Sequence, residues 1–501
     1  MANFELVELD SFDELLSAVK PLQLDSDETP RSHSRLQMIY ADKHQGGLVL
    51  NYLASGPRLE PFTMHRIRPR ESAVSSIAAQ IPLAGWYERE IADLFGLQFR
   101  GSPDQRRLVL HQGAHRESAP MSADALPATP STFDYMTPEL PEIEGENLQQ
   151  LSFGPIRADV VETGKFLFIY SGEGIIHLEM QLFYKHRGME QRFEGRDIRT
   201  AAVVAERISG IDSVAHALCL SLAVEESLGT QVPERAQQVR VILAELERLY
   251  NHLHYFALLS KLTTLKVGES HGLYLEEKVK QINSGLCGDR LLRGLVAPGG
   301  LRTDVDLSHL REGLALIAPE IEAYLGQLFK TRSFLDRLET TGILSPKVAF
   351  EQGATGPVER ASNLARDLRV DHPYSGYHKA KPKIAVEGGG DALARARIRR
   401  EEIFGSLGMI DRTLSGLSSG QVAAPCEAGG ASGEGVAWVE ATRGTLIYAV
   451  RIEDGRLARV KIKEPSFSNW RCFPFTVHGT NMMDYAINEA SFGLSTAGCD
   501  R

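Results

Sequence analysis

The chain has 501 residues, of which 43% are hydrophobic and 24% charged, and its formal net charge is −10. This composition is typical of a globular protein with room for two to four domains, and it excludes a membrane-spanning chain because no apolar run approaches roughly 18 residues. The charge follows no basic stripe and the start is acidic, so we expect neither nucleic acid as a partner nor export by a signal peptide.

The first part of the chain, residues 1–112, predicts a small α/β domain. Residues 47–53 and 62–67 are typical of strands, and residues 72–95 of a helix. Residues 113–148 are rich in Pro, Ala and Ser and lack apolar periodicity. Such a segment buries too little apolar surface to order itself, so we expect a linker.

The rest of the chain, residues 149–501, predicts a mainly helical bundle with small peripheral β-sheets. Strands are expected at residues 165–170 and 174–179, and helices, from apolar residues at three- and four-residue spacing, at 233–256, 273–287, 307–340 and 392–417. Three more strands are expected at 436–440, 445–450 and 458–462, with Asp454-Gly455 as a hairpin turn. The predicted fold class is therefore α+β.

The cysteines are few and dispersed, at Cys219, Cys287, Cys426, Cys472 and Cys499. No two of them form a Cys-x-x-Cys pair, which argues against a disulfide framework and against a locally held iron-sulfur or zinc site. We expect them to be small buried side chains in a reducing compartment.

A motif in the first domain, residues 85–108 (GWYEREIADLFGLQFRGSPDQRRL), is similar to the signature of the 30-kDa-type subunit of respiratory complex I. Trp86, Glu90 and Asp93 fall on neighbouring turns of one helix, and Arg106 and Arg107 follow as candidate partners for the carboxylates. We interpret this as a structural ion-pair network at a packed helix end.

Four blocks carry a second resemblance, at residues 183–190 (FYKHRGME), 232–240 (VPERAQQVR), 356–374 (GPVERASNLARDLRVDHPY) and 438–448 (WVEATRGTLIY). They resemble the 49-kDa-type subunit of complex I and the large subunit of membrane-bound, energy-converting nickel-iron hydrogenases. The resemblance implies a peripheral subunit on the cytoplasmic side of the inner membrane. Its implied partners are an iron-sulfur small subunit, a ferredoxin-like subunit and integral membrane antiporter-like subunits.

The metal-binding segments of such hydrogenases resemble residues 206–216 and 491–501, but the four thiolate positions carry Ser209, Asp212, Ser495 and Gly498. Soft sulfur holds the nickel in those enzymes, whereas a hydroxyl or a carboxylate is a poor substitute and glycine offers no ligand. We therefore expect no nickel-iron cluster, no metal and no cofactor in this chain, with any iron-sulfur cluster held by a partner.

The quinone site of complex I is also altered. The His and Tyr that hold the quinone headgroup there align with Val161 and Val204. A valine neither donates a hydrogen bond to a quinone carbonyl nor supplies its proton.

Several polar residues remain as candidates. Glu190, Asp212 and His216 are candidate catalytic residues, although Glu190 also fits a structural role. Asp212 and His216, spaced i and i+4, suit a proton relay, a hard metal or a buried hydrogen-bonded pair. We expect Arg207, Arg360, Arg501 or His216 to hold Asp212. His252 and His254 should point to different helix faces. The expected lining of the old cavity is Ser209, Arg360, Asp367, Ser495 and Arg501, with Arg369 and Asp371 completing an ion-pair lattice.

The sequence thus predicts the large subunit of a membrane-associated, complex I-like and hydrogenase-related complex that transfers electrons and translocates ions. Two alternatives remain open: an oxidoreductase subunit that uses a quinone or another acceptor in a modified cavity, and a non-redox scaffold coupled to ion transport. A deep cavity between the two altered segments would favour the first alternative, and a closed one the second. Direct use of NADH is not expected, because no Gly-x-Gly-x-x-Gly follows a strand.

Overall fold

The computed structural model describes residues 3–23, 34–111, 119–122, 143–145, 147–157, 162–426, 429–478 and 480–501. The predicted linker, residues 113–148, lies mostly outside these ranges, as does Val161, so both predictions stay untested. In the part of the chain that is described, no helix is long and apolar enough to cross a membrane.

The N-terminal unit is built on a four-stranded sheet in the order β1-β4-β3-β2, in which β1 and β4 are parallel and the other pairs antiparallel. Its elements are β1 (Phe4–Leu9), α1 (Phe12–Val19), η1 (Lys20–Leu22), β2 (Arg35–His44), β3 (Gly47–Ser55), β4 (Phe62–Ile67), β5 (Ala73–Ser75), α2 (Ala84–Phe95) and β6 (Gln98–Arg100). The helix predicted at 72–95 begins only at Ala84, because Ala73–Ser75 pair in parallel with β6 instead.

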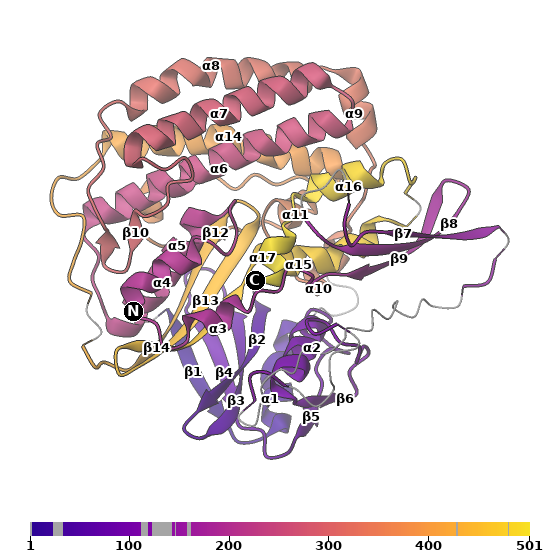
Figure 1. The fold of residues 1–501 in the computed structure, drawn as a ribbon, viewed down its shortest axis with the longest axis vertical. Helices are drawn as coiled ribbons and strands as arrows, with labels where there is room; N and C mark the ends of the chain where they lie inside the picture. Colours follow the sequence, from indigo (N-terminus) through magenta and orange to yellow (C-terminus); the bar gives the residue numbers. More distant parts are fainter. Residues whose placement is uncertain are drawn as a thin grey trace.

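A bundle of long helices forms the opposite end of the molecule (Figure 1). It consists of α6 (Glu234–Leu262), α7 (Lys266–Cys287), α8 (Leu310–Leu328), α9 (Arg332–Leu338) and α14 (Ala392–Ser415). The helix predicted at 307–340 is interrupted: α8 ends at Leu328 and α9 starts at Arg332. The other three predicted helices are found, and α7 starts seven residues earlier than expected.

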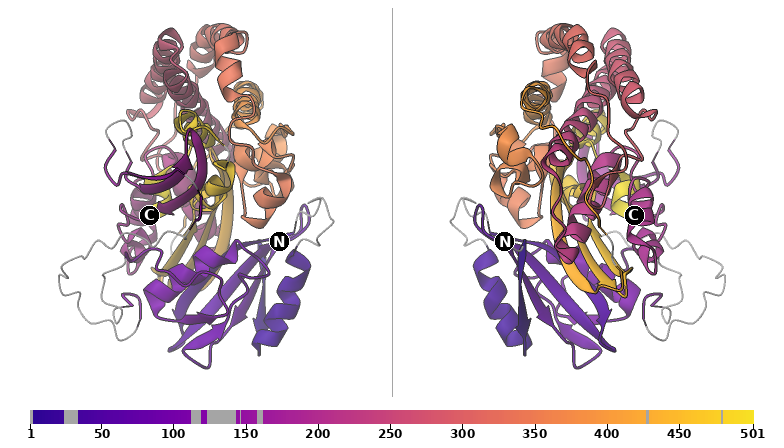
Figure 2. Two further views of the ribbon diagram at one scale, coloured as in Figure 1. Left: turned by 90° about the vertical axis from the view of Figure 1, so that its right-hand side faces the viewer. Right: turned by 90° about the vertical axis from the view of Figure 1, so that its left-hand side faces the viewer.

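Between the bundle and the N-terminal unit lies an antiparallel meander of β12 (Gly433–Ala441), β13 (Gly444–Glu453) and β14 (Arg456–Lys463) (Figures 1 and 2). The hairpin turn predicted at Asp454-Gly455 is confirmed. Both residues have positive φ, +47° and +77°, which is the geometry that closes a two-residue hairpin. Helix α5 (Ser213–Leu228) packs on β12 and β13.

The remaining elements surround this centre. A second antiparallel sheet combines β7 (Leu148–Phe153), which the sequence did not indicate, with β8 (Lys165–Ser171) and β9 (Gly174–Gln181). Short elements complete the chain: α3 (Met189–Phe193), α4 (Ile198–Ala205), β10 (Val296–Ala297), β11 (Gly300–Leu301), α10 (Pro346–Glu351), α11 (Gly356–Ala361), α12 (Leu368–Asp371), α13 (Tyr377–Ala380), α15 (Pro465–Cys472), η2 (Phe473–Thr476), α16 (Tyr485–Phe492) and α17 (Thr496–Asp500).

Buried ion pairs join the N-terminal sheet to the rest of the chain. Arg451 on β13 holds Asp42 on β2 through two nitrogens, at 2.7 and 3.0 Å. Arg35 on β2 lies 3.2 Å from Glu359 on α11, and both side chains are 2% exposed. Charged groups this deeply buried need their partners, so the two units are bound together firmly. All five cysteines are free, and all except Cys287 are buried, as expected.

Candidate functional site

The two altered metal segments come together in the structure. Ser209 and Asp212 precede α5, with Asp212 at its N-cap, while Ser495 caps α17 and Gly498 lies inside that helix. Arg187 bridges the segments from outside, because its Nη2 donates to Ile208 O at 2.6 Å and to Ala497 O at 2.9 Å. The altered positions therefore share one region beside the C-terminus.

Asp212 is paired with an arginine that the sequence did not indicate. Its Oδ2 accepts a hydrogen bond from Arg443 Nη1 at 3.0 Å, and the Asp212 side chain is only 1% exposed. The expectation that Arg207, Arg360, Arg501 or His216 would hold Asp212 is wrong. Arg443 reaches it from the β12–β13 turn, and its own position is fixed by a hydrogen bond from Nε to Gly493 O.

Glu464 fills the space that a side chain at position 498 would need. A Cβ on Gly498 would lie 2.5 Å from Glu464 Oε1 and 2.7 Å from Cδ. The Glu464 carboxylate is wholly buried at the N-cap of α15, where it accepts hydrogen bonds from Ser466 Oγ at 3.1 Å and Phe467 N at 3.2 Å. Burial, reinforced by the charge of Asp212, raises the pKa of Glu464 to about 8.

A further buried carboxylate caps the start of α5. Glu247 on α6 accepts hydrogen bonds from Val214 N at 2.7 Å and Ala215 N at 2.9 Å. Burial, followed by the charge of Asp212, raises the pKa of Glu247 well above its usual range. Asp212 therefore acts on two further buried carboxyl groups, Glu247 and Glu464.

Three buried polar atoms of this region have no hydrogen-bond partner, namely Ser209 Oγ, Asp212 Oδ1 and His216 Nε2. His216 uses its other ring nitrogen, Nδ1, at 2.8 Å from Tyr448 Oη. Burial lowers the pKa of His216 to about 4, so its ring is neutral at pH 7. Asp212 and His216 share a helical backbone hydrogen bond, and no hydrogen bond joins their side chains. The region has hydrogen-bonding capacity that the chain itself does not use.

A nickel-iron cluster does not fit these residues. The Ser495 hydroxyl is already engaged: it accepts from Gly498 N at 3.0 Å and donates to Glu162 Oε1 at 3.1 Å. Glu464 occupies the space that a ligand side chain at position 498 would need. Within the described ranges, no group of three or more His, Cys, Asp or Glu side chains is placed to hold a metal ion. The four altered positions therefore offer oxygen atoms and no thiolate, which suits nickel poorly.

Glu190 and Arg501 belong to a neighbouring buried cluster. Glu190 binds Arg459 at 2.9 Å, Lys461 at 3.0 Å and Arg501 Nε at 3.0 Å. Burial opposes its ionised form, but these three cations outweigh burial and lower the pKa of Glu190. A carboxylate held this strongly as an anion is suited to a structural role more than to proton transfer.

Glu90 of the N-terminal unit joins the same cluster. Its partners are Lys461, at 2.8 Å, and Arg501. Of the two arginines expected to pair with the carboxylates of this helix, Arg106 bonds to Asp104 and Glu179 instead, whereas Arg107 acts on Asp93. Asp93 accepts instead from the backbone N–H groups of residues 108–110. The helix end lies in a network of ion pairs and hydrogen bonds, as predicted, and the partners of Glu90 come from the distant residues Lys461 and Arg501.

Arg360 and Asp367 lie in a separate buried ion-pair group. Arg360 Nη1 is 2.9 Å from Glu440 and 3.5 Å from Asp367, which in turn lies 2.7 Å from Arg369. The lattice predicted from the sequence is present, and Asp371 joins it by accepting from Asp367 N. None of the hydrogen bonds found for Arg360 or Asp367 in the described chain reaches Ser209, Asp212 or Ser495. The group also includes Glu245, Arg248, His252 and Glu402.

The two histidines of α6 behave as their spacing predicts. His252 is buried, with Nε2 2.7 Å from Glu402, while the side chain of His254 is 51% exposed and pairs with Glu276. Val204 lies half-buried on α4 and packs against the apolar core. Its side chain therefore has a packing role.

The residues that the sequence missed are Arg443, Glu464 and Glu247. Arg443 lies inside the block 438–448 that carries the family resemblance, but nothing local pairs it with a residue 231 positions away. Glu464 stands before a proline at a strand-to-helix junction, which is an N-cap signal. Its approach to Gly498 is a tertiary contact with no local signature.

Family models match most of the chain. That of the 49-kDa subunit of respiratory-chain NADH dehydrogenase matches residues 272–429 and 427–501, and that of the 30-kDa subunit matches residues 23–130. The model of nickel-dependent hydrogenases matches residues 187–271.

Individual proteins give the same result. Formate hydrogenlyase subunit 5 of Escherichia coli (strain K12) is 31% identical over 82% of this chain and 74% of its own length. The fused C/D component of the NADH-quinone oxidoreductase of Rhodopseudomonas palustris (strain BisB18) is 28% identical over 95% of this chain and 89% of its own. A chain of the membrane-bound sulfane sulfur reductase, an archaeal respiratory membrane complex, has a TM-score of 0.67 at 27% identity, covering 71% of this chain and 99% of its own. The chain therefore belongs to the family of complex I 49-kDa subunits and nickel-iron hydrogenase large subunits, fused to a complex I 30-kDa-type domain.

Proposed function

We propose that this chain is the large subunit of a membrane-associated, complex I-like electron-transfer and ion-translocating complex, and that it works without a nickel-iron cluster of its own. One observation supports the proposed absence of a nickel-iron cluster. The Glu464 carboxyl occupies the volume that a ligand at position 498 would require, and Arg443 neutralises Asp212 beside it. An oxygen-rich, arginine-neutralised pocket binds nickel poorly.

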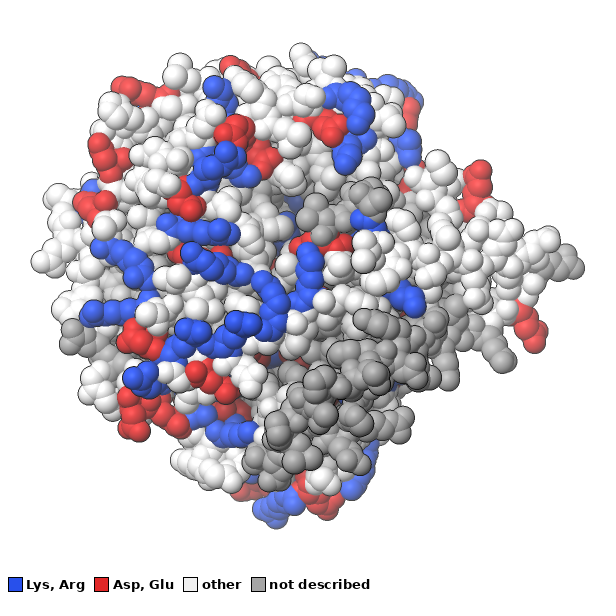
Figure 3. Space-filling model, viewed as in Figure 1, with Lys and Arg blue, Asp and Glu red and all other residues white. Residues whose placement is uncertain are grey.

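The proposed partners are an iron-sulfur small subunit, a ferredoxin-like subunit and antiporter-like membrane subunits, with the complex on the cytoplasmic side of the membrane. A positively charged face supports docking of an acidic subunit. Figure 3 shows Lys and Arg side chains crossing the face that carries α4 and α5. The exposed arginines of residues 187–207 are Arg187, Arg192, Arg196, Arg199 and Arg207. Arg187, Arg192 and Arg196 donate to backbone carbonyls, while Arg207 also pairs with Glu206 at 3.4 Å.

The names of two relatives indicate different electron acceptors. One relative belongs to a quinone oxidoreductase and another to a sulfane sulfur reductase. The decisive experiment is elemental analysis of the purified complex together with reduction assays using a quinone and a polysulfide. Iron without nickel, and electron transfer to one acceptor, would support the proposal. About one nickel per large subunit would overturn it.

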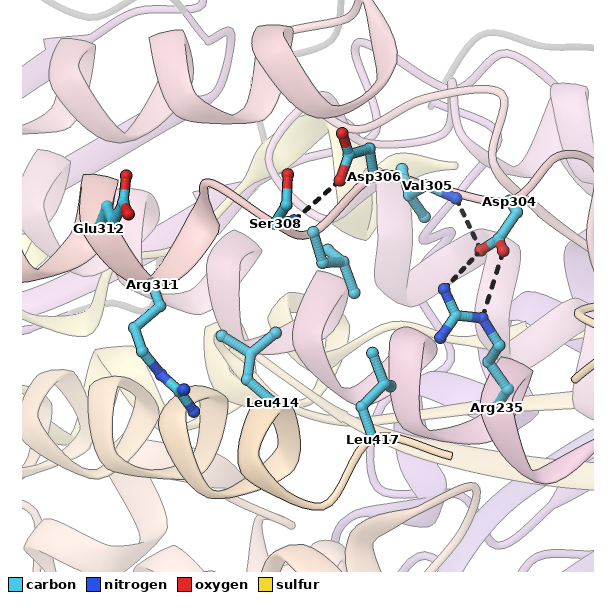
Figure 4. Close-up of a pocket in the computed structure, with 10 residues that line it drawn as sticks. Arg235, Asp304, Val305, Asp306, Ser308, Arg311, Glu312, Leu414 and Leu417 are labelled. Atoms are coloured by element: carbon cyan, nitrogen blue, oxygen red, sulfur yellow. Dashed lines mark hydrogen bonds and ion pairs between the residues drawn. The ribbon is translucent and has the colours of Figure 1, made fainter. Parts of the chain in front are cut away.

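A non-redox scaffold is the second candidate, and close packing favours it. Ser209, Asp212, Glu464 and Ser495 are each at most 1% exposed. A pocket of about 730 Å³ lies elsewhere, where α6 and α8 begin and α14 ends (Figure 4). Its Arg235 is paired with Asp304, so the pocket offers no free cation there. Ion transport by a complex that reduces neither the quinone nor the polysulfide would identify this chain as a non-redox scaffold.

A further inference from the structure

The altered metal region contains more carboxyl groups than cations. Asp212 enters from the N-cap of α5, Glu247 from α6 and Glu464 from the junction of β14 with α15. Arg443 is the cation bonded to Asp212. Arg501 is committed to Glu90 and Glu190.

Arg248 also acts on Glu247, but it is bonded to Glu245 and Glu402, and Arg187, which acts on His216, donates to backbone carbonyls. His216 on α5 has a lowered pKa and is neutral, while burial raises the pKa of the Tyr448 hydroxyl and of the Cys499 thiol well above their usual ranges. Asp212 and Arg443 act on Glu464, which in turn acts on Tyr448 and Cys499, whereas Glu247, His216 and Tyr250 face Asp212. Isolated ionised carboxylates are costly in such a buried place, so protons must supply the missing positive charge.

We propose that Asp212 and Glu464 form a buried carboxyl pair that holds one exchangeable proton, in the volume where the resemblance places the metal ligands of hydrogenases. The step is a simple protonation: a carboxylate takes a proton from solvent water and becomes a carboxylic acid, with no change of oxidation state. The proposal does not depend on whether the complex transfers electrons.

The unpartnered atoms give independent support. Ser209 Oγ and His216 Nε2 are buried at 1% and 0% residue exposure and have no hydrogen-bond partner, and Asp212 Oδ1 also lacks a donor. Buried polar atoms are normally hydrogen-bonded. A proton with its associated water supplies the donors that these atoms lack.

Arg443 connects the buried Asp212 with a partly exposed position. Its side chain is 11% exposed while its Nη1 touches the fully buried Asp212. Exchange through Asp212 would let the proton on Glu464 equilibrate with the outside. Glu464 lies at the closed end, where it is also fixed by Ser466 and Phe467. Burial raises its pKa to about 8, so the protonated form prevails at neutral pH.

The test is infrared difference spectroscopy of the full complex, titrated from pH 6 to pH 10 and followed at the carbonyl stretch of protonated carboxyl groups. Glu88 and Asp500 also have raised pKa values, so each band is assigned from the difference between variant and wild type. We expect Glu464→Gln to remove one titrating band with a midpoint near pH 8. An unchanged spectrum would overturn the proposal.

Two further variants separate a coupled pair from a lone buried acid. Asp212→Asn removes the neighbouring negative charge and should shift the Glu464 midpoint down by at least one pH unit. Arg443→Gln removes the positive charge and should shift it up. Shifts in opposite directions support the pair, and an identical midpoint in both variants overturns it. These two variants decide the question even if Glu464→Gln fails to assemble. Nickel analysis of the same samples reports separately on the proposed function.

Discussion

The side chain of the C-terminal residue Arg501 links Glu90, in the N-terminal unit, to Glu190, in the hydrogenase-like part of the chain. Its Nη2 binds Glu90 Oε1, and its Nε lies 3.0 Å from Glu190 Oε1. All three side chains are less than 10% exposed. The arginine therefore fixes the two units and the altered metal segment in one buried cluster.

Removing Glu90 should loosen this junction. Glu90→Ala leaves Lys461 and Arg501 short of one carboxylate in a buried place, which we expect to cost about 3 kcal/mol of folding free energy. The measurement is chemical denaturation of the purified complex. The matched control is Glu71→Ala, because Glu71 and Arg100 form an ion pair with side chains 67% and 68% exposed. That variant should lose less than about 1 kcal/mol. Equal losses of folding free energy in both variants would show that the buried ion pairs of Glu90 do not hold the two units together.

Local sequence patterns predicted the helices and strands more accurately than they predicted the contacts between side chains. Residues 62–67 form β4 with the predicted bounds, and Asp454-Gly455 forms the predicted turn, because alternation and turn chemistry are encoded within a few residues. The false start of the helix at residue 72 has a tertiary cause. Residues 73–75 pair with β6, and a pairing partner outside the window cannot be read from local periodicity.

The candidate site was located but not understood from the sequence. The altered positions were found by resemblance, and the structure brings them together. Arg443 and Glu464 decide what the site has become, yet their contacts join residues 231 and 34 positions apart. Which of several arginines reaches a buried aspartate depends on how the sheet meets α5. The order of charged residues along the chain does not indicate which arginine makes this contact.

Asp212→Ala should destabilise the protein because it strands Arg443. The Asp212 side chain is 1% exposed and that of Arg443 is 11% exposed, so the unpaired guanidinium has little access to water. We expect a loss of about 3 kcal/mol by thermal or chemical denaturation. Arg207→Ala is the control, since Arg207 is exposed and does not contact Asp212. A stable Asp212→Ala complex with abolished electron transfer would instead make Asp212 a catalytic residue.

The stability of the protein should fall on the acid side partly through His216. Burial lowers the pKa of His216 to about 4, below the value of about 6.5 in an unfolded chain. The unfolded state therefore binds the proton first, so stability is complete above pH 6.5 and is lost as the pH falls from 6.5 to 4. His252 has a lowered pKa of about 4 as well and contributes over the same window.

The size of the His216 contribution can be measured by substitution. Wild type should lose about 1.4 kcal/mol per pH unit more than His216→Asn between pH 6 and pH 4.5. His309→Asn is the matched control, because the His309 side chain is 88% exposed, and it should follow wild type. Parallel stability curves for wild type and His216→Asn would show that His216 does not stay neutral in the folded protein.

Restoring a thiol at position 498 should be disruptive because Glu464 occupies its space. The Cβ of Gly498→Cys would lie 2.5 Å from Glu464 Oε1, closer than any normal contact, and the carboxylate is fixed by α15. We expect a loss of about 1–3 kcal/mol. Gly285→Cys is the control, since a Cβ there meets nothing within 4 Å. In a Glu464→Ala background the penalty of Gly498→Cys should shrink, so that a double-mutant cycle gives a coupling of at least about 0.5 kcal/mol. If the free-energy changes of Gly498→Cys and Glu464→Ala simply add, Glu464 does not occupy the space beside position 498.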